Sequence, residues 1–76
     1  MGYDVTKLPE RMVRARKARR MTQTDLGMAI GGISPVIISK YELGRQLPSA
    51  RRLAQLAEAL QVTPGWLLGY TKEEEA

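Results

Sequence analysis

The chain has 76 residues, a net charge of +4, no cysteine and no histidine. A chain this short forms a single domain with a small core. Disulfides are excluded, a structural zinc site is disfavoured, and thiol nucleophiles and histidine-containing triads are absent. Carboxylates are few, and three of the eight stand together at residues 73–75. We therefore expect no enzyme and no cofactor.

Hydropathy and charge limit the compartment and the partners. No apolar run reaches the roughly 20 residues that span a bilayer, and Asp4 and Lys7 interrupt the stretch after Met1, unlike a signal peptide. We expect a cytoplasmic protein without a membrane partner. Residues 1–70 carry eleven basic and five acidic side chains, against one and three in residues 71–76. A basic domain suits a polyanionic partner, although solubility alone would also account for the charge.

The first two predicted segments are helices with clear boundaries. One opens at Pro9, a residue favoured in the first helical turn, and runs to about Arg19. Its apolar side chains at helical spacing are Leu8, Met12 and Ala15. The second covers residues 23–30, with Thr22 as N-cap and Asp25 three residues on, a short capping box. Gly31-Gly32 ends it, because glycine tolerates the left-handed helix terminus.

Three more helices follow. The third covers residues 35–43, with Ser34 as N-cap, and stops at Gly44. The fourth begins after Ser49, and its apolar face consists of Leu53, Leu56, Ala57 and Leu60. The fifth is short: Thr63 caps it, Pro64 opens it, its apolar residues include Trp66, Leu67 and Leu68, and Gly69 closes it.

These segments predict an all-α fold, a compact five-helix domain over residues 8–70. Residues 1–7 are expected to form a flexible N-terminus and residues 71–76 an acidic disordered tail. Two short helices, 23–30 and 35–43, are joined by a glycine-containing turn at the centre of this domain. That arrangement is typical of the helix-turn-helix unit.

Three stretches make the prediction more specific: MTQTDLGMAI, ISPVIISKYELGRQLPS and LAQLAEALQVTPGWLLG. With them, residues 8–70 resemble the Cro/CI-type (XRE-like) DNA-binding domain of phage repressors and bacterial regulators. The resemblance implies a lambda-repressor-like fold and a sequence-specific transcriptional regulator, a repressor that binds a palindromic DNA operator as a homodimer. No β-rich alternation or internal repeat competes with this interpretation.

The resemblance also assigns roles to residues outside the third helix. It implies that Gln23, with Thr22 beside it at the start of the second helix, binds a phosphate through that helix N-terminus. It pairs Arg16 with Glu42. The loop after the third helix would lie over the DNA backbone, and its expected phosphate contacts are Leu43, Arg45 and Arg51. For Gln23 and Arg16 the alternative is an ordinary surface position.

Basic side chains cluster in the first helix, at Arg14, Arg16, Lys17, Arg19 and Arg20. Arg16, Arg19 and Arg20 share a side by helical spacing. A solvated surface and a DNA contact explain this cluster equally well.

On a helical wheel, Val36, Ser39, Lys40 and Leu43 share the outward face of the third helix, whereas Ile38 and Tyr41 face the core and Ile37 lies at the border. We expect Val36, Ser39 and Lys40 to read bases, with Pro35 supplying shape. The outward face lacks the usual bidentate readers of guanine and adenine, and a branched methyl group at residue 36 favours thymine.

Two departures from the family concern the central turn. Family members usually carry one residue fewer between Leu26 and Tyr41, and Gly31-Gly32 contains the insertion, which affects the expected angle of the third helix. Gly27 stands where the family usually has alanine, at the close contact between the two helices.

Two further expectations concern protein partners. The resemblance suggests a dimer interface at the fifth helix and its approach, with Val62, Trp66 and Leu67 as candidates, although Trp66 could instead be purely a core residue. The alternative function is an antitoxin or other protein-interaction module of the same fold, with a toxin as a possible partner. Its support is the set of apolar residues on the third helix, Val36, Ile37 and Leu43.

Overall fold

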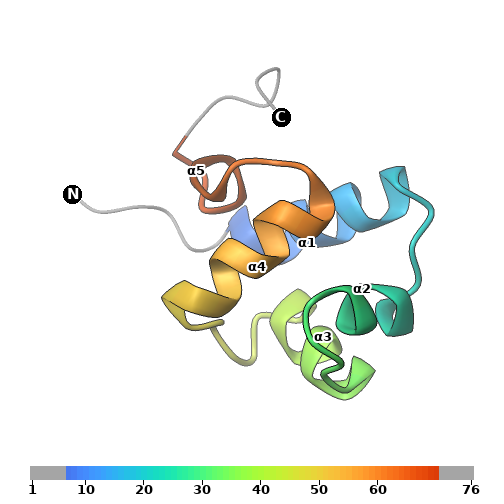
Figure 1. Ribbon diagram of the computed structural model, residues 1–76. Helices are drawn as coiled ribbons and strands as arrows, with labels where there is room; N and C mark the ends of the chain where they lie inside the picture. Colours follow the sequence, from blue (N-terminus) through green and yellow to red (C-terminus); the bar gives the residue numbers. More distant parts are fainter. Residues whose placement is uncertain (1–6, 71–76) are drawn as a thin grey trace.

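The computed structural model describes residues 7–70, and all of its regular elements are helices. They are α1 (Lys7–Ala18), α2 (Gln23–Ala29), α3 (Pro35–Glu42), α4 (Ala50–Leu60) and α5 (Pro64–Leu67). Figure 1 shows α2 and α3 at one side of the domain and α5 at the other, with α1 and α4 crossing between them. The predicted all-α, five-helix fold is confirmed for this part of the chain.

The predicted tails lie outside the described residues, apart from Lys7, which already belongs to α1. Across residues 7–70, no helix combines the length and the apolar character that a membrane crossing requires.

Polar caps fix the starts of four helices where the sequence predicts them. The Thr22 hydroxyl accepts from the Asp25 N–H, and the Thr22 N–H donates to the Asp25 carboxylate, each over 2.9 Å. The hydroxyls of Ser34, Ser49 and Thr63 accept from backbone N–H groups in the first turns of α3, α4 and α5. Each cap satisfies an N–H that has no partner within its helix.

The start of α1 differs from the prediction. The helix begins at Lys7, two residues before Pro9, and ends at Ala18. Proline is tolerated there because N–H groups in the first helical turn have no intrahelical acceptor. The second and third helices also end one residue early, since Ile30 and Leu43 are C-cap residues.

One apolar core joins all five helices. Its buried members are Leu8, Met12, Ala15, Leu26, Ile30, Ile38, Tyr41, Leu56, Ala57, Leu60, Trp66 and Leu67. Leu53, predicted on the inner face of α4, packs against this core and is partly buried. Because both α2 and α3 contribute to the core, the position of α3 depends on the packing of the whole domain.

The turn between α2 and α3 folds back against α2 at Gly27. The carbonyl oxygen of Gly27 accepts from the N–H groups of Ile30, Gly32 and Ile33, over 3.0–3.3 Å. A Cβ on Gly27 would lie 2.3 Å from the carbonyl oxygen of Ile33. Gly31 and Gly32 have φ angles of 101° and 84°, which side chains rarely adopt. The close contact predicted at Gly27 is therefore made with the turn itself, and this path of the turn requires a residue without a Cβ.

We predict that Gly27→Ala destabilises the domain even though alanine is the better helix former. Overpacking costs about 1–3 kcal/mol, and an approach of 2.3 Å to a backbone oxygen places this site in the upper part of that range, above the gain of about 1 kcal/mol in helix propensity. Thermal unfolding followed by circular dichroism measures the difference. Met28→Ala, on the same helix and 69% exposed, is the control and should change little. A melting temperature of Gly27→Ala at or above that of the parent would contradict the role of this contact.

Candidate nucleic-acid interface

The outward face of α3 has the exposure that the helical wheel predicts. Pro35, Val36 and Lys40 are exposed, and Ser39 is half-buried. Leu43, at the C-cap, is 62% exposed, as Val36 is 60% exposed. On the opposite face Ile38 and Tyr41 are buried, and Ile37 is partly buried between the two faces.

The outward face of α3 is chemically simple. It offers one ammonium group, on Lys40, one hydroxyl group, on Ser39, and the aliphatic surfaces of Val36 and Leu43. The backbone N–H of Val36 donates to the Ser34 hydroxyl over 3.0 Å, so the cap holds the first turn in place. Valine is β-branched and strongly prefers one χ1 rotamer in a helix. The exposed methyl groups of Val36 are thus presented in a defined direction.

A buried ion pair fixes the inner side of α3. Arg16 donates from Nε to Glu42 Oε2 over 2.7 Å and from Nη2 to Oε1 over 3.1 Å. Only 11% of the arginine side chain and 5% of the glutamate side chain are exposed. A bidentate arginine–carboxylate pair restricts orientation as well as distance. The predicted pairing of Arg16 with Glu42 is present, and it connects the end of α3 to α1.

Two more contacts extend this pair to the start of α2. Arg16 Nη1 donates to the carbonyl of Met21 over 2.9 Å, in the segment that links α1 to α2. The amide Nε2 of Gln23 donates to Glu42 Oε1 over 3.0 Å. We call Arg16, Gln23 and Glu42 the Glu42 cluster. It joins α1, α2 and α3.

Gln23 has one of its two side-chain N–H groups available to an external ligand. It is the first residue of α2 and half-buried, and one of its two amide N–H groups is held by Glu42. The second amide N–H and the unpaired backbone donors of the first turn remain the polar groups suited to an anion. This bond to Glu42 was missed from the sequence, since the resemblance implied only the pairing with Arg16.

Thr22 and Asp25 complete the start of α2. The hydroxyl oxygen of Thr22 accepts from the backbone N–H of Asp25, and the same hydroxyl group interacts with the Asp25 carboxylate. The Thr22 backbone N–H, and then its side chain, holds the pKa of Asp25 below the ordinary value of 3.8. The contribution of this carboxylate to folding is therefore present above its ordinary pKa and is lost as the pH falls through the lowered value.

The other predicted phosphate contacts, Leu43, Arg45 and Arg51, lie between the end of α3 and the first turn of α4. The N–H of Arg45 donates to the carbonyl of Lys40 over 2.9 Å, so the loop doubles back on the end of α3. Arg45 and Arg51 are both exposed. The N–H of Leu43 already donates to the carbonyl of Ser39 over 2.9 Å. Leu43 therefore has no polar donor for a phosphate, and only its apolar side chain is available for contact.

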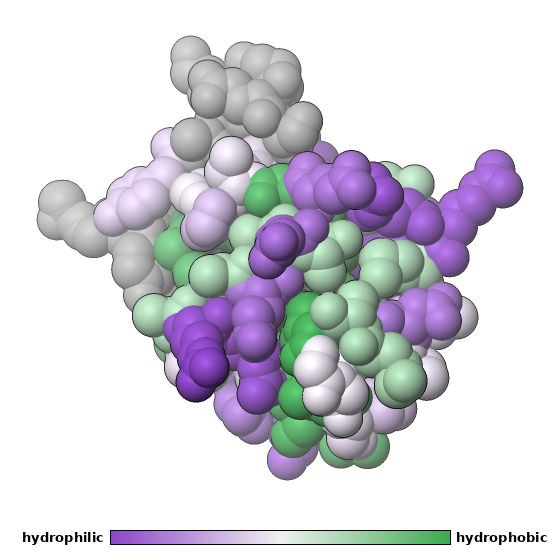
Figure 2. Space-filling model, in the orientation of Figure 1, coloured by the Kyte–Doolittle hydropathy of each residue, from purple (hydrophilic) through white to green (hydrophobic). Residues whose placement is uncertain are grey.

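The basic residues of α1, and Arg19 and Arg20 directly after it, have different surroundings. Arg16 is taken by Glu42, Arg14 forms an exposed pair with Glu10 over 3.6 Å, and Arg19 donates to Gln61 Oε1 over 3.0 Å. Lys17 and Arg20 are exposed. In Figure 2 hydrophilic and hydrophobic side chains alternate over the visible face.

Arg11 was not identified from the sequence as a structural residue. It is 4% exposed, donates from Nη1 to the carbonyl of Trp66, and stacks on the Trp66 ring at 4.9 Å from the centroid. The spacing of Arg11 from Leu8 and Ala15, three and four residues, is the signal that could have shown its inward orientation.

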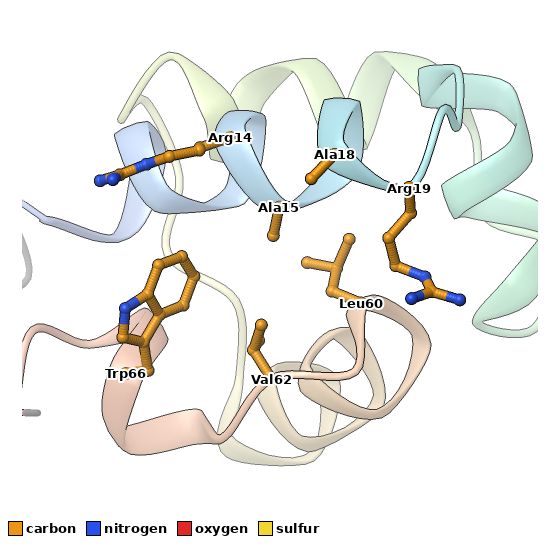
Figure 3. Close-up of a pocket in the computed structure, with 7 residues that line it drawn as sticks. All are labelled: Arg14, Ala15, Ala18, Arg19, Leu60, Val62 and Trp66. Atoms are coloured by element: carbon orange, nitrogen blue, oxygen red, sulfur yellow. The ribbon is translucent and has the colours of Figure 1, made fainter. Parts of the chain in front are cut away.

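The residues predicted for a dimer interface lie in two environments. Trp66 is 3% exposed and Leu67 is fully buried, so both side chains pack inside the domain. Val62 is half-buried and lines a groove of about 360 Å³ together with Arg14, Ala15, Ala18, Arg19, Leu60 and Trp66 (Figure 3). Of the three candidates, Val62 is the one with side-chain surface left for a partner.

Known proteins resemble this chain over most of its length. The family profile described as helix-turn-helix matches residues 13–67. The cryptic phage CTXphi transcriptional repressor RstR of Vibrio cholerae serotype O1 is 36% identical over 69 residues, which cover 91% of this chain and 61% of that protein. A vegetative-specific protein of Dictyostelium discoideum is 40% identical over 55 residues, or 72% of this chain and 52% of that protein. The chain thus spans between half and two thirds of these relatives.

Two solved structures have the same fold. The P22 c2 repressor in its crystal complex with the synthetic operator 9T superposes with a TM-score of 0.79 at 34% identity, covering 84% of this chain and 96% of that one. The solution structure of the DNA-binding domain of the P22 c2 repressor gives 0.75 at 32% identity, covering 95% and 96%. The lambda-repressor-like fold expected from the sequence is confirmed.

We predict that Glu42→Gln lowers the stability of the domain substantially. Removing one partner of a buried pair leaves the arginine charge uncompensated and costs about 3–5 kcal/mol, although the glutamine retains one acceptor and favours the lower end. For a domain of this size such a loss lowers the melting temperature by at least about 10 °C.

Glu10→Gln is the matched control, because its pair with Arg14 is exposed and pairs of that kind contribute below about 1 kcal/mol. If Glu42→Gln melted within a degree of the parent, the Glu42 cluster would not hold the helices together.

Proposed function

The chain belongs to the helix-turn-helix family, and from this premise we propose that it is a sequence-specific DNA-binding transcriptional regulator that represses by occupying an operator. The observation that carries the proposal is the exposed face of α3, fixed from behind by Glu42 and carrying Val36 and Lys40 toward solvent. The likeness to a repressor solved with its operator supports it.

Base readout is assigned to the first two turns of α3. A recognition helix enters the major groove with its N-terminal part nearest the bases. Val36 packs on a thymine methyl group, Lys40 lies one turn further on and donates to guanine, and Ser39 donates or accepts with weak discrimination. Pro35 has no N–H and contributes shape. Since no bidentate pair forms on this face, part of the specificity comes from DNA shape.

Phosphate contacts are assigned to both sides of α3. On one side are Thr22 and the free amide N–H of Gln23, at the positive end of α2. On the other are the exposed side chains of Arg45 and Arg51. The contact between Gln23 and Glu42 links the two functions, because the same carboxylate orients the readout helix and a phosphate donor.

The functional form is a homodimer on a palindromic operator. A single α3 of eight residues reaches only a few base pairs, and pairing brings two half-sites under one protein. Half-sites then lie about 34 Å apart, as for phage repressors of this motif. The surface proposed for pairing is the groove edge at Val62, since Trp66 and Leu67 are occupied by the core.

A protein-interaction module is the second candidate, and one observation favours it. Val36, Leu43 and Leu47 are each about 60% exposed, and apolar surface of this kind also suits a protein partner such as a toxin. A gel-shift experiment with genomic fragments, run beside a pull-down, separates the candidates. Retarded DNA supports the regulator, and a captured protein without retarded DNA supports the module.

We predict that DNA binding weakens steeply with salt. The logarithm of the association constant should fall by about 0.9 per neutralised phosphate for each unit of the logarithm of salt concentration. Fluorescence anisotropy of a labelled duplex between about 50 and 200 mM salt measures the slope. Arg45→Gln should make the slope less negative by about one. A slope near zero for the parent would refute the DNA-binding role.

We predict that two chains bind one operator and that Val62→Glu prevents this. Sedimentation on a duplex with both half-sites should give two chains for the parent and one for the variant, and circular dichroism should show that the variant stays folded, because Val62 lies half-buried at the edge of the core. Leu67→Glu is unsuitable because it would place a charge in the core. Two bound copies of Val62→Glu would remove this surface from the dimer interface.

A further inference from the structure

The outward face of α3 offers a base mainly apolar surface and few groups that form hydrogen bonds. Tyr41 is buried, with its hydroxyl 3.5 Å from Arg52 Nη1, and Glu42 is held by Arg16 and Gln23. The sequence of α3 contains no asparagine, glutamine or arginine. The polar groups left on the outward face belong to Ser39 and Lys40 alone.

Val36 dominates what the first turn of α3 offers to a base. It is 60% exposed, and it follows a proline that has no N–H. Its own N–H is used by the Ser34 hydroxyl. A base edge facing the Val36 side chain therefore meets two methyl groups and no free backbone donor from residues 35 and 36. Such a surface detects a methyl group by contact and cannot detect whether the neighbouring atom of the base is a donor or an acceptor.

The C5 position of a pyrimidine lies on the major-groove edge in both thymine and cytosine. Thymine has a methyl group at C5 and an acceptor at C4, whereas cytosine has a donor at C4. A cytosine methylated at C5 has the thymine methyl group with the cytosine donor. An asparagine, glutamine or arginine reader would distinguish these two bases by their hydrogen bonds, and an isopropyl group would not.

We propose that Val36 reads the C5-methyl group of a pyrimidine and not thymine as such, so that 5-methylcytosine substitutes for thymine at the Val36 position. This inference rests on the proposed DNA-binding function and specifies its ligand. Binding by this protein would then respond to cytosine methylation of its DNA.

Lys40 reinforces this substitution. It lies one turn beyond Val36 and is exposed. When 5-methylcytosine replaces thymine, guanine replaces adenine in the opposite strand and offers O6 and N7 as acceptors to an ammonium group. Replacing thymine by 5-methylcytosine therefore keeps the methyl group that Val36 would contact. It also adds an acceptor, guanine O6, that suits the ammonium group of Lys40. Leu43 is equally exposed but stands at the C-cap of α3, away from the N-terminal turns that approach the bases.

The test uses a duplex selected by this protein from random DNA, with one half-site pyrimidine varied at a time. Thymine, uracil, cytosine and 5-methylcytosine are placed at that position, each opposite its complementary base, and affinities are measured by fluorescence anisotropy at one salt concentration. At the Val36 position we expect thymine and 5-methylcytosine to bind within about twofold, and uracil and cytosine to bind about threefold to fivefold more weakly, as for one lost methyl contact.

For Val36→Ala, duplexes with uracil and thymine should bind with equal affinity, and so should duplexes with cytosine and 5-methylcytosine. Leu43→Ala is the control, because it truncates a side chain of similar exposure. This control should keep the preference for the methylated base in both comparisons. Equal binding of thymine and uracil at all positions would overturn the inference while leaving DNA binding intact. So would 5-methylcytosine that binds no better than cytosine wherever thymine is preferred. If no duplex is selected from random DNA, the proposed function fails, and this inference fails with it.

Discussion

Three helices meet at the carboxylate of Glu42. It ends α3, it is almost completely buried, and it accepts from Arg16 of α1 and Gln23 of α2. A buried charge is tolerated only when it is paired and hydrogen-bonded, so α3 can take few orientations that keep this carboxylate satisfied. The apolar core sets the distance of α3 from the other helices, and Glu42 sets its rotation about its own axis.

The turn before α3 supplies the second constraint. The carbonyl of Ile33 occupies the space that a Cβ at residue 27 would fill. Glycine at residue 27 therefore costs helix propensity in α2 and permits close packing of the turn. With both constraints in place, Val36 and Lys40 face solvent and Ile38 and Tyr41 face the core.

The sequence predicts most of this because the deciding signals are local. Four N-caps follow from hydroxyl residues ahead of apolar periodicity, and the two faces of α3 follow from the helical repeat. The bond from Gln23 to Glu42 and the stacking of Arg11 on Trp66 join residues 19 and 55 positions apart, and no local pattern encodes such contacts. The same limit applies to Leu67, which the family resemblance suggested for an interface and which the packing of α5 on α1 and α4 buries.

Selection of bound sites from random double-stranded DNA shows whether α3 recognises a DNA sequence, since the experiment assumes neither an operator nor a partner. If the Glu42 cluster presents α3 to a major groove, the selected sequences will contain an inverted repeat whose half-sites are centred about one helical turn apart. Each half-site will also show a preferred thymine, the base of ordinary DNA that has a C5-methyl group. Selected pools with no shared motif would contradict the account, because the exposed face of α3 would then have a different ligand.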